Sequence, residues 1–150
     1  MATVYALQNG KSKSMHTTNY FNTLIEIAED SAATTGVIPP IKGDKKSVAN
    51  LQYEMLADHP YEYTSDEVLF GVFATRNAIA EAELAAAREQ FFAKGQPCFR
   101  ASPLTKTYGW GVHSNEAGKI AMYAVDSEEY RALVADDAVA KKKAMRSKRK

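Results

Sequence analysis

Residues 107–125, "TYGWGVHSNEAGKIAMYAV", carry the pattern that decides the fold. Asn115 and Gly118 lie where a type I turn followed by a left-handed glycine requires them, so the stretch predicts a β-hairpin that pairs Asn115 with Lys119. Because side chains alternate along a strand, this register assigns one set to the core. That set consists of Tyr108, Trp110, Val112, Ile120, Met122 and Ala124.

A third strand is predicted at residues 98–101, "CFRA", antiparallel to the hairpin and pairing Ala101 with Tyr108. The face opposite the core then contains two glycines, and glycines inside strands mark a close approach of another group. We therefore expect a shallow recess on the sheet that binds a small anionic metabolite. The residues assigned to it are Arg100, Ser102, Lys106, Gly109, Gly111, His113 and Tyr123.

The chemistry of this expected recess has competing interpretations. Arg100 offers a planar fork of donors that suits a carboxylate or phosphate, and His113 titrates near neutral pH. Cys98 becomes a nucleophile only if His113 lowers its pKa. Ser102-Pro103 is also a common helix start, a strand histidine is often only hydrogen-bonded, and a lone cysteine is often a small buried side chain. These residues do not decide whether the protein is an enzyme.

A second anion site is suggested by Lys45, Lys46 and Ser47, which follow Gly43 and precede a predicted helix. A helix N-terminus with free amides favours phosphate. The spacing does not match the GxxxxGK[ST] pattern of a P-loop, so a capped surface turn is the favoured interpretation.

The other elements follow from periodicity and capping residues. Residues 20–29 alternate as a strand, and Ser47 begins a helix that extends to about Asp58. Residues 68–75 are β-rich and apolar on both faces, which predicts a central strand, although Thr64 and Glu67 have capping-box spacing. Helices are expected from Asn77 to about Lys94 and after Ser127. The prediction is an α+β domain with a largely antiparallel five-stranded sheet and about three helices.

Composition limits the class of protein. The 150 residues, 45% hydrophobic and 25% charged, are typical of one globular domain. The lone Cys98 excludes an internal disulfide, and the three histidines lack metal-ligand spacing, so we expect no metal and no cofactor. No apolar run is long enough to span a bilayer, which favours a soluble, cytoplasmic protein without a membrane partner. Residues 1–14 are expected to form a flexible extension before the domain of residues 15–140, with Met15 as an alternative start.

The chain ends in a basic segment, residues 141–150, whereas residues 1–140 carry 12 Lys or Arg and 18 Asp or Glu, a net charge of −6. Such a tail can contact phosphates, an anionic surface, or the acidic body of its own or another chain. A solvated terminus is favoured, because an acidic body repels nucleic acid. The polyanion contacts would be Lys141, Lys142, Lys143, Arg146, Lys148, Arg149 and Lys150.

Several motifs also resemble those of a family of small microbial proteins classed as a domain of unknown function. They are "MHTTNYFNTLIEIAED", "PPIKGDKKSVANLQYEM", "PYEYTSDEVLF", "SPLTKTYGWGVHSNEAGKIAMY" and "KAMRSKRK", in this order over about residues 15–150. The resemblance implies a class and no mechanism. Two function classes therefore remain: a domain that binds or transforms a small anionic metabolite in the recess, or a non-enzymatic interaction module whose basic tail contacts nucleic acid or an acidic protein. A purely structural oligomer is a third alternative.

Overall fold

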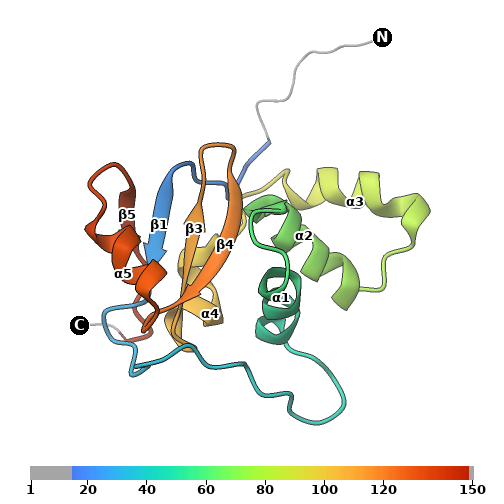
Figure 1. Cartoon of the computed structure of the whole chain (residues 1–150). Helices are drawn as coiled ribbons and strands as arrows, with labels where there is room; N and C mark the ends of the chain where they lie inside the picture. The colour runs from blue at the N-terminus through green and yellow to red at the C-terminus, as the bar shows by residue number, and fades with distance from the viewer. Residues whose placement is uncertain (1–14, 149–150) are drawn as a thin grey trace.

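The computed structural model describes residues 15–148, which form an α+β domain around one five-stranded sheet (Figure 1). The predicted extension of residues 1–14 lies outside the described residues. The strands are β1 (Thr23–Glu26), β2 (Tyr63–Thr64), β3 (Trp110–Ser114), β4 (Lys119–Ala124) and β5 (Ala140–Lys143). The α-helices are α1 (Val48–Ala57), α2 (Ser65–Arg76), α3 (Leu84–Phe91), α4 (Pro103–Lys106) and α5 (Glu128–Ala135), with 3-10 helices η2 (Glu81–Glu83) and η3 (Phe99–Ala101).

The β3–β4 hairpin confirms the predicted register. Val112 pairs with Met122, and Asn115 N donates to Lys119 O at 2.9 Å. Gly118 has a φ of +82°, the left-handed conformation that the turn requires. Val112 and Ile120 are almost fully buried in the core, as expected, with Trp110 and Met122 packed against them.

The sheet is mixed rather than largely antiparallel. Its strand order is β2-β4-β3-β1-β5, and β5 runs parallel to β1 while the other neighbours are antiparallel. The lysines of β5 gave no apolar alternation from which a strand could be predicted. Backbone pairing to β1 forms the strand nevertheless, so the first three residues of the predicted tail belong to the sheet.

The predicted central strand of residues 68–75 is wrong, because these residues form most of α2. A full capping box begins the helix: Thr64 Oγ1 accepts from Glu67 N at 3.1 Å, and Glu67 Oε1 accepts from Thr64 N at 2.8 Å. Val68 and Val72, one turn apart, pack into the core. Phe70 packs instead on Phe91 of α3, with ring centroids 5.6 Å apart. Burial on two sides therefore gave this helix the alternating apolar pattern of a strand.

Two further boundaries differ from the prediction. Residues 98–101 are not a strand, since Phe99–Ala101 is the 3-10 helix η3, and Ser102 caps the short helix α4 that follows. Asn77 ends α2 instead of beginning a helix, and α3 is confined to Leu84–Phe91. The pairing of Ala101 with Tyr108 is therefore wrong as well. Residues 15–148 contain five α-helices rather than about three.

The two faces of the sheet are covered unequally. The core lies between one face and helices α1, α2 and α4, which contribute Leu56, Val68 and Leu104. The other face carries α5 (Figure 1). The ring of Tyr130, on α5, lies over Gly111 of β3. Helix α3 lies beyond α2, outside the main layers, and none of its residues is buried.

Candidate functional site

The two glycines of the predicted recess are covered by the protein itself. A Cβ at Gly111 would lie 2.5 Å from the ring of Tyr130, and one at Gly109 would overlap the carbonyl oxygen of Thr35. The inference of a close approach at these glycines was sound. The approaching groups are an α5 side chain and a loop carbonyl, which occupy the space predicted for a ligand.

His113 and Tyr123 do lie together, and Tyr61 joins them. Tyr61 Oη is 2.7 Å from His113 Nδ1 and 2.9 Å from Tyr123 Oη. Burial lowers the pKa of His113, with the Asp136 carboxylate opposing this shift, and burial together with the Tyr123 hydrogen bond raises the pKa of Tyr61. Tyr61 has a φ of +60°, a left-handed conformation that its hydroxyl contacts help to hold. These hydrogen bonds connect the segment before β2 to β3 and β4 on the outer face of the sheet.

Arg100 is separated from this cluster. Its Nε donates to Lys143 O of β5 at 2.7 Å, at the opposite edge of the sheet from Tyr61. Cys98 Sγ lies 3.6 Å from Tyr20 Oη, so the structure pairs neither Arg100 nor Cys98 with His113. Burial, reinforced by the Cys98 contact, raises the pKa of Tyr20.

The remaining residues of the predicted recess belong to α4. Ser102 is its N-cap, since its Oγ accepts from Leu104 N at 3.0 Å. Lys106 is the last residue of the same helix and is partly exposed. Neither residue lies in a strand, so the predicted face does not form as a unit.

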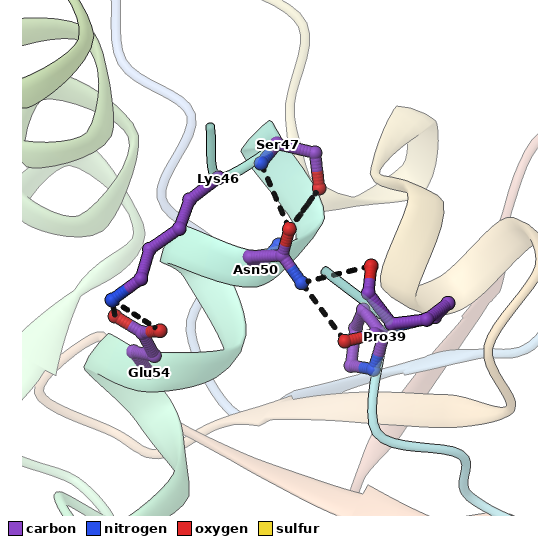
Figure 2. A network of polar contacts seen from close by, with 6 residues as sticks. Pro39, Lys46, Ser47, Asn50 and Glu54 are labelled. Carbon is purple, nitrogen blue, oxygen red and sulfur yellow. Dashed lines mark hydrogen bonds and ion pairs between the residues drawn. The ribbon is translucent and has the colours of Figure 1, made fainter. Parts of the chain in front are cut away.

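The second predicted anion site is engaged in capping α1 (Figure 2). Ser47 N donates to Asn50 Oδ1 at 2.8 Å, and the Asn50 amide holds the carbonyl of Pro39 at 2.8 Å. Lys46 Nζ lies 2.9 Å from the Glu54 carboxylate. Lys45 lines a shallow cavity beside this turn. The capped turn is therefore present, with its polar groups used to fix the preceding loop.

The basic tail contacts an acidic segment of its own chain. Lys143 lies 3.4 Å from Glu26, and Arg146 lies 3.2 Å from Glu29. The backbone amides of Ser147 and Lys148 both donate to Asp30 Oδ2 at 2.9 Å. The Lys148 amide is the main reason that the pKa of Asp30 is lowered. Lys141 Nζ donates to Asp136 O, Lys142 pairs with Ile25 in the sheet, and Arg149 and Lys150 lie outside the described residues.

A cavity of about 410 Å³ lies between the helices and is the strongest candidate for a ligand site. Helix α1 contributes Gln52, α2 contributes Arg76, and the segment around η3 contributes Cys98 and Ser102. Its volume lies within the range of small-molecule sites. Most of its walls are apolar, including Val48, Leu69, Val72, Phe73, Phe91 and Pro103.

Gln52 is the polar group best placed to orient a ligand in this cavity. Its side chain is buried, with 3% of the residue exposed, and its Oε1 accepts from Ser102 Oγ at 2.6 Å. Within residues 15–148, Gln52 takes part in side-chain hydrogen bonds only as this acceptor, so its amide NH₂ has no protein partner. The NH₂ group is therefore free to donate to an acceptor on a ligand in the cavity.

Arg76 gives the cavity its charge. It is the only charged side chain among the lining residues, it lies in the last turn of α2, and no ion pair within residues 15–148 involves it. A second cavity, of about 480 Å³, adjoins the first, and Lys94 is its only charged lining residue. Both cavities therefore present cations without carboxylates. Within the same residues, no group of three or more His, Cys, Asp or Glu side chains could hold a metal ion.

Sequence reasoning found part of this cavity and missed the rest. The sequence predicted roles for both Ser102 and Cys98. Cys98 was assigned to a strand that does not form, and Ser102 was assigned to a recess on the sheet, whereas it caps α4. Gln52 and Arg76 were missed because the strand predicted at residues 68–75 separated α1 from the segment that carries Arg76. The capping box at Thr64 was the signal that would have placed α2 beside α1.

The chain belongs to the family of unknown function DUF6157, whose model matches residues 15–150. No curated protein and no solved structure matches the chain. None of the helices of residues 15–148 is long and apolar enough to cross a membrane.

Proposed function

We propose that the protein binds a small carboxylate with an apolar body in the cavity between α1, α2 and η3. The observation that carries the proposal is the combination of apolar walls with one cation, Arg76, and one amide, that of Gln52, whose NH₂ makes no hydrogen bond within residues 15–148. Apolar walls supply affinity in such sites, and a few polar groups fix the orientation of the ligand.

The charge balance supports an anion as the ligand. The chain carries 18 Asp or Glu, yet the cavity wall contains none of them. Arg76 attracts a carboxylate, and the Gln52 NH₂ donates to one of its oxygens, so both groups favour the same ligand chemistry. The tail of residues 143–148 is held on Glu26, Glu29 and Asp30, which gives polyanion binding less support.

Calorimetric titration with hexanoate tests this function, with hexanol as the neutral analogue. We expect saturable binding of hexanoate and weaker binding of hexanol. Arg76→Gln should weaken hexanoate binding about tenfold, because a hydrogen bond to a charged group contributes about 1.5 kcal/mol. Arg131→Gln is the matched control, since Arg131 lies on α5 and donates to Asp126 O, away from the cavity.

Nuclear magnetic resonance locates the bound anion. Hexanoate should shift the side-chain amide resonances of Gln52, which lines the cavity. If hexanoate does not bind, or if it binds while the Gln52 amide is unaffected, the proposed site is wrong.

A further inference from the structure

The two cavities beside α2 share a wall. Phe73, Phe91 and Gln96 line both of them, and the rings of Phe73 and Phe91 lie with their centroids 4.8 Å apart. The second cavity continues the apolar surface with Ile79 and Ala87. A molecule that reaches Phe91 from the first cavity therefore meets more apolar surface beyond it.

Helix α3 is attached in a way that leaves this second cavity beside it. None of the α3 residues is buried, and its aromatic contacts are those of Phe91 with Phe70, Phe73 and Phe92. The α3 side chains that line the second cavity are Ala87, Gln90 and Phe91, and the small Ala87 leaves space beside it. Phe73 remains 37% exposed, although a large aromatic side chain gains free energy from being covered.

We propose that the ligand is a straight-chain carboxylate of the fatty-acid class that occupies both cavities. This inference rests on the proposed function. The carboxylate lies in the first cavity, where Gln52 and Arg76 meet it, and the alkyl chain crosses Phe73 and Phe91 to reach Ile79 and Ala87. Lys94 lies at the second cavity, where its aliphatic stem covers the chain while its ammonium group stays in water.

A chain-length series tests the inference, with hexanoate, octanoate, decanoate and decanol kept below their micelle-forming concentrations. Each methylene that enters the second cavity should raise the affinity by about fourfold, the ratio that corresponds to about 0.8 kcal/mol. Decanol should bind more weakly than decanoate, because it lacks the charge that Arg76 recognises. Equal affinity for hexanoate and decanoate would overturn the inference and leave the proposed function in place, whereas no binding of either would overturn both.

A pair of variants on α3 provides a matched control. Ala87→Phe fills the second cavity and should remove the extra affinity of decanoate while hexanoate binding stays unchanged. Ala86→Phe adds the same side chain at an exposed neighbouring position and should behave as wild type. If Ala87→Phe and Ala86→Phe bind decanoate equally well, the chain does not enter the second cavity.

Nuclear magnetic resonance of the wild-type protein provides a test that does not require these variants to fold. Decanoate should shift the methyl resonances of Ile79 as well as those of Val48, whereas hexanoate should shift only those of Val48. The two side chains line different cavities, Val48 the first and Ile79 the second. If decanoate leaves the Ile79 methyl resonances unshifted, the proposal is overturned.

Discussion

The β3–β4 hairpin and helix α2 are both built largely of apolar residues, but they are buried in different ways. In the hairpin, Val112 and Ile120 pack into the main core, while His113 lies on the face that carries α5. In α2, Val68 packs into the core and Phe70 packs on α3, so apolar side chains are needed on two sides. An element that buries one face shows a clear hydrophobic period in its sequence. An element that buries two sides has apolar residues on both, so its period cannot be recognised.

The same difference explains where a cavity can form. Paired strands hold their side chains at fixed spacing, and Tyr130 closes the outer face of the hairpin over Gly111. Helix α2 is packed between α1 and α3, which has no buried residue, and both cavities lie beside α2. The proposed ligand site therefore lies where helices pack irregularly, and not on the regular surface of the sheet.

The largest effect expected in the comparison is at the entry to the hairpin. Gly109→Ala should destabilise the protein by about 3 kcal/mol or more, because Gly109 has a φ of +81° and the new Cβ would overlap the Thr35 carbonyl. Gly43→Ala is the control: its φ of +73° is similar, but nothing lies within 4 Å of the added Cβ. It should cost about 1 kcal/mol in strain alone. Urea unfolding measures both losses, and equal losses would show that Thr35 does not press on Gly109.

The residue pairs of the hairpin could be predicted because they depend on residues that are close together in the sequence. Asn115 and Gly118 define the turn, and the turn fixes every pair along both strands. Strand β5 could not be predicted in this way, since Lys141, Lys142 and Lys143 give no apolar alternation and the strand forms by pairing with a segment far away in the chain. The order of the predicted strands and helices indicated an α+β domain, but only long-range contacts make the sheet mixed.

In helix α2, a smaller effect is expected, and it tests whether the N-terminal cap contributes to the helix in addition to tertiary packing. Thr64→Ala should cost about 1 kcal/mol, because it removes the hydroxyl that accepts from Glu67 N in the capping box. Thr75→Ala, an exposed change on the same helix, should be nearly neutral. Thermal or urea unfolding gives both values. A Thr64→Ala protein as stable as wild type would mean that tertiary packing alone determines α2 and that the cap is incidental.

The candidate site could be predicted only in part, because its residues come from five separate elements, α1, α2, α3, η3 and α4. Ser102 was among the predicted anion-binding residues, but its hydrogen-bond partner Gln52 is fifty positions away, and no local pattern links the two. Arg76 was hidden by the incorrect strand. Correcting that one element from the Thr64 cap would have brought α1 and α2 together, although the position of α3 still depends on the aromatic contacts of Phe91.

The smallest effect is expected from the outer face of the hairpin, where His113 makes stability depend on pH. Burial lowers the pKa of His113 in the folded protein, whereas the unfolded chain takes up a proton near the ordinary value of 6.5. Between these two pKa values the unfolded state binds more protons, so the free energy of unfolding falls as the pH decreases below 6.5. Above that value the contribution of His113 is constant.

Urea unfolding at a series of pH values, for the wild type and His113→Gln, isolates this contribution from that of the carboxylates. The wild type should lose more stability than the variant as the pH falls through the window, by a modest amount because His113 is partly exposed to solvent. The charge of the Asp136 carboxylate opposes the shift, so Asp136→Asn should lower the folded pKa further and extend the window to lower pH. A wild type that gains stability over the variant on acidification would show that Asp136 outweighs burial, and that the outer face of the hairpin favours a charged histidine.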